Sequence, residues 1–304
     1  MNIFVTGGTG VLGRVVVRLL LDGGHHVRAL ARNSDSHSRL RAAGAEPVQA
    51  SLFDPSTLRV VLQGCDAILH LATRIPPPKD ASRRDAWREN DKIRAEGTRN
   101  LVNIALESEV ATLIYPSVVF VYLDGGAQWM DAGTAVKPAA ILESSLQAEA
   151  EVERFSRAGR RGIVLRMGSF YGPTAGTTRS MLRMARHGVA MIFGASNSYQ
   201  PLIWVDDAAV AVFDALGKAP PGIYDIVDDE PLQRRELASV LAQAAGRRWL
   251  FRPPVWLFWI LAGKNVMFLT RSQRVSNQQF KKATGWYPMV PNARDGFRLL
   301  VIEP

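Results

Sequence analysis

The feature that most constrains this chain is a glycine-rich turn between a short strand and a helix at its start. Asn2–Thr6 is an apolar, strand-like run, and residues 11–21 have the periodicity of a helix. Residues 6–13 between them read Thr-Gly-Gly-Thr-Gly-Val-Leu-Gly. Glycines at this spacing permit a tight turn and let the backbone approach a pyrophosphate, whose charge the helix N-terminus stabilises. The turn therefore predicts a dinucleotide site that includes Gly7, Gly10, Val11, Leu12 and Gly13. A tight turn without a ligand is the alternative.

The first half of the chain alternates between strand and helix signals. Further strands are expected at 26–31, near Val48, at 67–71, 112–115 and 162–167, with a long polar helix over about 84–107. Repeated strand–helix units with short connections require a parallel sheet with helices on both faces. After Gly168 the pattern loosens. We expect an α/β fold with a doubly wound parallel sheet over 1–167. A smaller α/β substrate lobe should cover 168–304, with residues about 200–230 returning to the sheet domain.

Composition limits the partners and the compartment. The 304 residues include 37 Lys and Arg against 28 Asp and Glu, a formal net charge of +9. This balance favours an acidic partner such as a phosphorylated cofactor, but no nucleic-acid-binding motif accompanies it. Cys65 is the single cysteine, which favours the reducing cytoplasm, and the five histidines lack metal-ligand spacing, so no metal is expected. The stretch 255–269 is short of a membrane span and predicts a buried or interfacial helix pair.

The end of the second strand distinguishes the two nicotinamide dinucleotides. An acidic residue there accepts a hydrogen bond from a ribose hydroxyl of NAD, whereas a basic residue favours the 2′-phosphate of NADP. Ala31 and Arg32 end this strand, so NADP(H) is the favoured cofactor. Asp35 lies close by and keeps NAD(H) as the alternative. Arg32 could also be a solvated charge at the strand end.

Further motifs follow along the chain. They are residues 51–55 (Ser-Leu-Phe-Asp-Pro), 70–73 (His-Leu-Ala-Thr), 115–117 (Tyr-Pro-Ser), 165–173 (Leu-Arg-Met-Gly-Ser-Phe-Tyr-Gly-Pro), 204–208 (Trp-Val-Asp-Asp-Ala) and 285–288 (Gly-Trp-Tyr-Pro). Over nearly its whole length the chain resembles the extended branch of the short-chain dehydrogenase/reductase superfamily, with its epimerases, dehydratases and reductases. The resemblance implies a Rossmann-type fold, a nicotinamide cofactor, and a small carbonyl or sugar-like substrate. It also implies cofactor contacts from Ser51, Leu52, Leu71, Ala72, Thr73, Ser117, Gly168, Ser169 and Phe170.

The residues that carry chemistry in this family are replaced. The family has a Tyr, and a Lys four residues later, one turn apart on a helix, where the ammonium makes the phenol more acidic. None of the six tyrosines here is followed four residues later by Lys. Alignment through Glu151 puts Glu143 at the Tyr position and Gln147 at the Lys position. Other replacements are Val118 at the usual Ser, Arg94 at a usual Asn and Trp204 at a usual His.

Three residues are candidates for the proton donor: Glu143, Tyr171 and Tyr122. Glu143 can hold a proton at neutral pH only if it is buried, and we expect an apolar pocket walled by Val118, Tyr171 and Trp204. Gln147 and Arg179 are expected at the same substrate pocket. Each candidate also has a structural interpretation, because a carboxylate favours the first turn of a helix and tyrosines pack well in cores.

Two classes of function stay open on these observations. One is an NADP(H)-dependent oxidoreductase or epimerase-like enzyme with a substituted proton relay. The other is a non-redox use of the scaffold, as a cofactor-sensing regulator or as a lyase, cyclase or isomerase. Binding of NADPH without turnover would favour the second class. A homodimer is an open alternative for the assembly.

Overall fold

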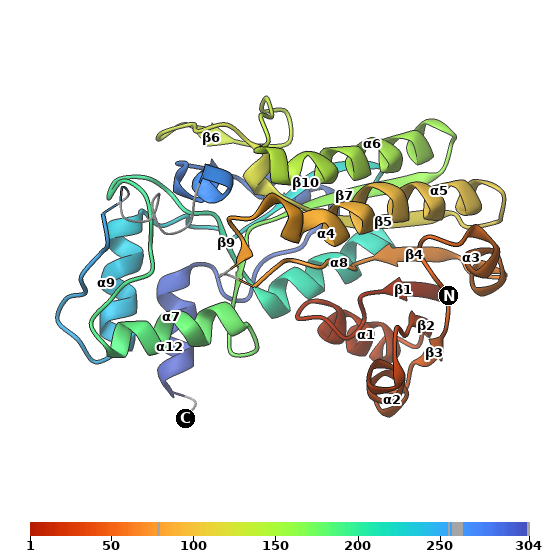
Figure 1. Ribbon diagram of the computed structural model, residues 1–304, viewed down its shortest axis with the longest axis horizontal. Helices are drawn as coiled ribbons and strands as arrows, with labels where there is room; N and C mark the ends of the chain where they lie inside the picture. The colour runs from red at the N-terminus through yellow and green to blue at the C-terminus, as the bar shows by residue number, and fades with distance from the viewer. Residues whose placement is uncertain (78–79, 255, 257–263, 303–304) are drawn as a thin grey trace.

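A seven-stranded parallel sheet forms the centre of the computed structural model (Figure 1). The structure describes residues 1–77, 80–254, 256 and 264–302. The strand order is β10-β7-β5-β4-β1-β2-β3, and every neighbouring pair is parallel. The strands are β1 (Asn2–Thr6), β2 (His26–Leu30), β3 (Glu46–Val48), β4 (Ala67–His70), β5 (Thr112–Val118), β7 (Arg161–Met167) and β10 (Gly222–Ile226).

Helices cover both faces of this sheet. Consecutive side chains of each strand point to opposite sides, and because these strands are apolar on both sides, each face must be buried. Phe4 packs into one core and Val5 into the other. The Val5 face is covered by α1 (Gly13–Asp22), α8 (Val205–Lys218) and α11 (Gln278–Thr284), and the Phe4 face by α3 (Pro55–Leu62), α5 (Thr98–Leu106) and α6 (Glu143–Arg157). The predicted doubly wound α/β fold is confirmed.

The long polar helix expected over about 84–107 is divided into four parts. A 3-10 helix, η2 (Arg84–Trp87), is followed by α4 (Arg88–Lys92), a π-helical turn, η3 (Ile93–Gly97), and then α5. A π-helical turn widens the helix by one residue, and such turns occur frequently at functional sites. The remaining elements before the C-terminal lobe are α2 (Ser34–Ala42), η4 (Val119–Val121), β6 (Trp129–Met130) and η5 (Ala140–Leu142).

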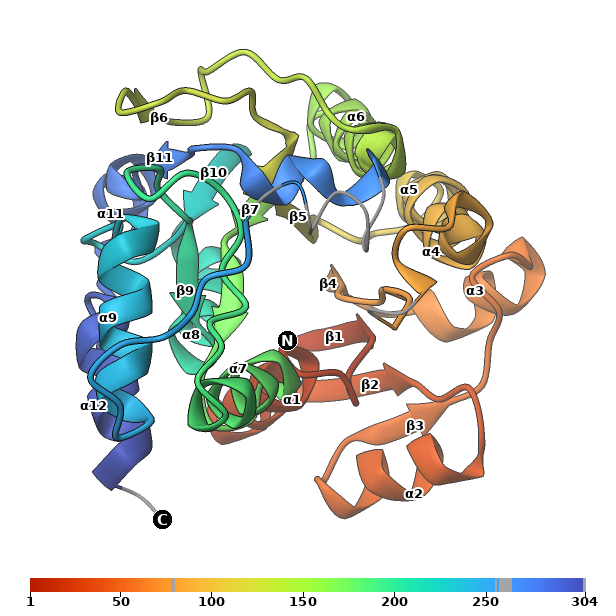
Figure 2. The same ribbon diagram turned by 60° about the vertical axis from the view of Figure 1, so that its left-hand side comes forward.

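Three helices form the core of the C-terminal lobe. In the view of Figure 2, α9 and α12 lie side by side at the left, and α9 packs against both of the others. These helices are α7 (Gly176–Arg186), α9 (Arg234–Ala244) and α12 (Ala293–Ile302). Two short strands, β8 (Ser169–Tyr171) and β9 (Leu202–Trp204), pair with each other and pack in the same core. The later elements η6 (Lys264–Thr270) and β11 (Arg274–Val275) pack elsewhere, and β11 pairs with β6. The helix pair expected over 255–269 lies largely outside the described residues.

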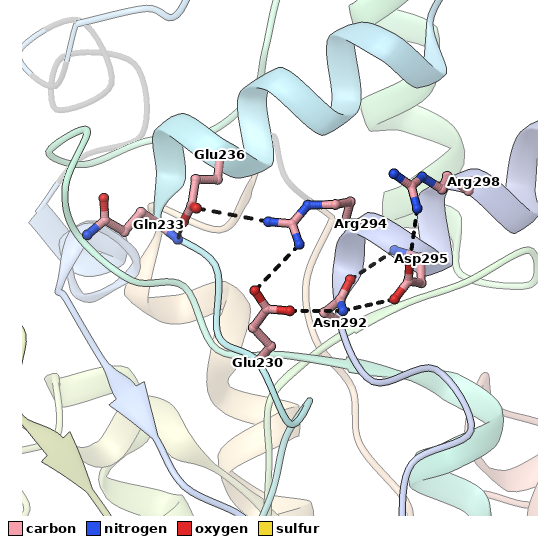
Figure 3. Close-up of polar contacts among 7 residues, drawn as sticks. All are labelled: Glu230, Gln233, Glu236, Asn292, Arg294, Asp295 and Arg298. Atoms are coloured by element: carbon pink, nitrogen blue, oxygen red, sulfur yellow. Dashed lines mark hydrogen bonds and ion pairs between the residues drawn. The ribbon is translucent and has the colours of Figure 1, made fainter.

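A polar network joins the starts of α9 and α12 (Figure 3). Glu230 accepts a hydrogen bond from Asn292 at 3.1 Å and lies 3.4 Å from the guanidinium of Arg294, which also reaches Glu236 at 4.0 Å. The side chain of Asn292 in turn accepts a hydrogen bond from the amide of Asp295 in the first turn of α12. Exposed ion pairs contribute little stability, so the apolar side chains that α9 and α12 share in one core mainly hold these helices together. Among the described helices, none is long and apolar enough to cross a membrane.

Candidate dinucleotide-binding site

The predicted cofactor residues meet at the carboxyl edge of the sheet. The chain runs from β1 outward through β2 and β3, and then returns to β4 on the other side of β1. In a doubly wound sheet, the point where the strand order reverses is where ligands bind. Gly7 follows β1 with a φ of +72°, and a Cβ there would lie 2.7 Å from the backbone of Leu71 and Ala72, which follow β4. The two strand ends therefore touch, and only glycine fits between them.

The turn after β1 leaves backbone donors available at the start of α1. The amide of Gly10 donates to the carbonyl of Gly7 at 2.9 Å, which closes the turn. Within the described structure, the amides of Val11, Leu12 and Gly13 donate to no backbone carbonyl. Gly10 and Val11 are exposed. Free amides at a helix N-terminus attract anions, so the turn fits the pyrophosphate of a dinucleotide.

A buried hydrogen-bond chain holds the two strand ends together beneath the turn. Ala72 donates its amide to the hydroxyl of Thr6 at 3.2 Å, and that oxygen lies 2.7 Å from Nδ1 of His70. Nε2 of His70 lies 3.4 Å from the carbonyl of Ile93. Burial lowers the pKa of His70 to about 4. The imidazole is therefore neutral at neutral pH, and its role is to fix the edge rather than to carry charge.

Arg32 lies just beyond the end of β2, where it was expected. Its side chain is 61% exposed and lies 4.0 Å from the carboxylate of Glu89. Arg39 of α2 donates to the carbonyl of Thr9 at 3.5 Å, so a second guanidinium reaches the glycine turn. The sequence pattern does not indicate Arg39, because its position depends on how α2 packs. In the loop after β3, Ser51 is exposed and Leu52 packs in the core on the Phe4 face of the sheet.

The ends of β5 and β7 complete the edge. The hydroxyl of Ser117 donates to Glu149 of α6 at 2.5 Å, so it is engaged with the helix layer. Gly168 packs against the backbone of Leu202, where a Cβ would come within 2.9 Å of the Leu202 carbonyl carbon. Ser169 and Phe170, which follow it, are half-buried, and Thr73 after β4 is exposed.

The side of α6 that faces the sheet differs from the predicted one. The buried residues of this helix are Ser144, Ser145, Ala148, Glu149, Val152 and Phe155, whereas Glu143 and Gln147 are exposed. Glu149, and not Glu151, is the glutamate of α6 that is buried against the sheet, where it pairs with Arg166. The same spacing counted back from Glu149 gives Ser145 and Ile141, both 0% exposed. The apolar burial expected for Glu143 is absent, and that part of the prediction is wrong.

Tyr122 and Tyr171 are buried in separate clusters, and each is bonded to a carboxylate. The hydroxyl of Tyr122 donates to Asp225 at 2.9 Å, and that of Tyr171 donates to Asp228 at 3.0 Å. Burial, with the nearby carboxylate, raises the pKa of both phenols well above the usual value. Both hydroxyls therefore keep their protons, and the geometry gives these tyrosines a packing role.

The residues expected to wall one substrate pocket are also separated. Trp204 stacks edge-on against Tyr171, with 5.3 Å between ring centroids, in the core of the C-terminal lobe. Val118 packs instead with Ile141 and its neighbours in another cluster. Arg179 is exposed on α7. Tyr171 and Trp204 therefore pack in one cluster and Val118 in another.

The fold and the glycine turn define a Rossmann-type dinucleotide-binding protein. The chain belongs to the NAD dependent epimerase/dehydratase family, whose family model matches residues 3–226. Its curated relatives include 3-diazoavenalumate denitrifying reductase from Streptomyces sp, 29% identical over 97% of this chain and 99% of the relative. They also include 2-alkyl-3-oxoalkanoate reductase from Stenotrophomonas maltophilia, 28% identical over 81% of this chain and 76% of the relative.

A similar solved structure agrees with this assignment. The structure of human epimerase family protein SDR39U1 with NADPH superimposes with a TM-score of 0.81 at 22% identity, over 100% of both chains. At this identity the likeness establishes the fold. Together, the family and its reductase relatives make this chain an NAD(P)-dependent oxidoreductase or epimerase-like enzyme that uses a nicotinamide cofactor.

Proposed function

We propose that the protein is an NADP(H)-dependent reductase that acts on a small electrophile, such as a carbonyl compound, at the carboxyl edge of the sheet. The observation that carries this proposal is the glycine turn with its free amides beside β4, together with Arg32 at the end of β2. The reductase names of both curated relatives support hydride transfer over a non-redox use of the scaffold.

The cofactor would lie across the switch point, which is the place between β1 and β4 where the strand order reverses, with one half on each side. The amides of Val11, Leu12 and Gly13 would bind the pyrophosphate, and Arg32 would bind the 2′-phosphate on the β2 side. When bound, NADPH would supply a hydride for the substrate. The substrate would then lie on the β5 and β7 side, between the sheet edge and the C-terminal lobe.

The proton relay is the second part of the proposal. Glu143 is exposed. The buried carboxyl groups near the carboxyl edge are each bonded to another side chain, namely Glu149 to Arg166 and Ser117, Asp225 to Tyr122, and Asp228 to Tyr171. We propose that no protein side chain protonates the product directly. A carbonyl reduced by hydride would take its proton from water. A substrate that expels a neutral leaving group on hydride addition would need no proton.

Glu143→Gln is expected to leave the rate of hydride transfer within about twofold of the wild type, because a helix-end carboxylate contributes mainly to the local field of α6. This rate is measured as the single-turnover oxidation of bound NADPH by a substrate that the wild type reduces. A much larger loss of rate, with NADPH affinity unchanged, would restore Glu143 as the proton donor.

Arg32→Ala is expected to weaken NADPH binding by about tenfold or more, because a charge-assisted hydrogen bond to the phosphate is lost. NADH binding should stay unchanged. Arg41→Ala is the matched control, since Arg41 is an exposed arginine in the last turn of α2, the helix that follows Arg32. Titration calorimetry with both dinucleotides checks the prediction. Equal losses for NADPH and NADH would contradict a phosphate contact.

Deuterium transfer tests the proposed reaction. The protein is loaded with NADPH deuterated at the transferable position and mixed with a panel of 3-oxo acids, other small ketones and an arenediazonium compound. Deuterium in a reduced product supports the proposal. Tight NADPH binding with no deuterium transfer to any member of the panel would favour the non-redox alternative.

A further inference from the structure

Arg94 is a buried cation that lacks a carboxylate partner. It lies in the π-helical turn η3, between α4 and α5, and it is 2% exposed. Its guanidinium donates one hydrogen bond, to the hydroxyl of Ser145 at 2.5 Å, and its Nε has no partner. No carboxylate among the described residues lies within 4.0 Å of it. A guanidinium has five N–H donors, and a buried charge with so few partners is unfavourable unless another group pairs with it.

The neighbouring side chains cannot supply that pairing. His70 is neutral at neutral pH, because burial lowers its pKa, and the charge of Arg94 lowers it further. Burial raises the pKa of Tyr115 to about 12, so this phenol is also neutral, and its hydroxyl has no partner. Glu149 is already bonded to Arg166 at 2.7 Å and to Ser117. The site around Arg94 therefore contains a guanidinium N–H donor and a phenol hydroxyl that no described residue satisfies by a hydrogen bond.

The place of Arg94 in the sheet indicates which ligand group it can reach. His70 ends β4, and its Nε2 lies 3.4 Å from the carbonyl of Ile93, the residue before Arg94. Ser145 is on α6, which packs against β5. Arg94 therefore lies on the β4–β5 side of the switch point, opposite Arg32 on β2. A dinucleotide that binds across the switch point with its adenosine over β2 places its other half over β4 and β5.

We propose that Arg94 binds the vicinal hydroxyls of the nicotinamide ribose, a contact that rests on the proposed function. The planar guanidinium presents paired N–H donors, which match two adjacent oxygens better than a single ammonium does. The π-helical turn brings this side chain between the sheet and α6. The positive charge between the sheet and α6 is thus supplied by η3. On the α6 side, Ser145 contributes a hydroxyl group. Arg94 is a cofactor-positioning residue on this account.

Binding of two ligands is compared, to distinguish a direct contact of Arg94 from a general disturbance of the cofactor site. NADPH has both halves of the dinucleotide, whereas adenosine 2′,5′-bisphosphate has only the half expected over β2. Arg94→Met should weaken NADPH binding by about tenfold or more, and binding of the bisphosphate by less than about twofold. Arg99→Met is the matched control, because Arg99 is an exposed arginine of the adjoining helix, paired with Glu151. It should change neither affinity.

The outcomes are distinguishable. A selective loss of NADPH affinity in Arg94→Met supports the contact, whereas an equal loss for both ligands, or no loss for either, overturns it. If Arg94→Met does not fold, the same titrations are made with Arg94→Lys, which keeps the charge but not the paired donors. A selective loss then supports the contact, and unchanged affinities overturn it. If the wild type binds neither ligand, the proposed function itself fails, and the contact fails with it.

Discussion

Gly13→Ala is expected to abolish dinucleotide binding and to destabilise the fold by about 3 kcal/mol, the upper end of the usual cost of overpacking. The added Cβ would lie 2.0 Å from the carbonyl oxygen of Gly7 and 2.9 Å from the Cα of Gly8. Both atoms belong to the backbone, so no side-chain rotation relieves the clash. The turn or the start of α1 must shift, and the free amides shift with it. Urea unfolding and NADPH titration measure the two effects.

Two other glycines serve as comparisons for this variant. Gly176→Ala is the matched control, because a Cβ at the start of α7 meets nothing within 4 Å, and its stability should be unchanged. Gly10→Val places a side chain beside the pyrophosphate site, where a Cβ has only the Gly7 carbonyl oxygen nearby, at 3.1 Å. It should lose NADPH affinity with a much smaller loss of stability. A Gly13→Ala protein that binds NADPH and unfolds like the wild type would contradict this description of the turn.

Arg166→Met is expected to cost about 3–5 kcal/mol of unfolding free energy, because it leaves a buried carboxylate unpaired. Arg166 donates to Glu149 through Nε at 3.1 Å and through a second nitrogen at 2.7 Å, and both side chains are nearly inaccessible. It also donates to the hydroxyl of Tyr122 at 2.9 Å. The pair fixes the rotation of α6 against β5 and β7, and therefore the position of Ser145. Urea unfolding measures the cost.

An exposed pair provides the control for this experiment. Arg59 lies 2.6 Å from Glu107, but both side chains are more than half exposed. Arg59→Met should therefore change stability by at most about 1 kcal/mol. The double variant Arg166→Met with Glu149→Leu should recover part of the loss, since apolar residues can replace a buried pair. If Arg166→Met costs no more than Arg59→Met, the buried pair does not hold α6 in place.

The start of the fold is predictable from the sequence because its determinants are local. The strand before Gly7, the glycine spacing and the helix after Gly13 lie within a few residues of one another. Parallel strands place their carboxyl ends at one edge, so the positions of Arg32 and Leu71 also followed from the pattern. No long-range contact had to be known for these assignments.

The rotation of α6 and the role of Arg94 could not be predicted in this way. A shift of two residues turns a helix face by roughly 200°, and the choice between Glu149 and Glu151 depends on which one meets Arg166 across the core. One signal was available: an arginine within the apolar strand 161–167 requires a buried acid as its partner. The sequence shows Arg94 only as a replacement for a usual Asn. Its burial depends on a π-helical turn, whereas the sequence pattern predicts one continuous helix over this segment.

The C-terminal lobe was the least predictable part for a similar reason. Tyr171 ends β8 and Trp204 ends β9, and the two residues meet because these strands pair. Phe297 of α12 completes the stack from much later in the chain. Tyr171 and Trp204, which the sequence predicts at a pocket wall, are therefore packed in a core.

Titration calorimetry of the wild-type protein with NADPH and with NADH tests the central claim most directly. The claim is that the free amides of the glycine turn bind a dinucleotide, and that Arg32 selects the 2′-phosphate. The account predicts one dinucleotide per chain, with NADPH bound about tenfold or more tightly than NADH. Binding of neither dinucleotide, or tighter binding of NADH, would contradict it.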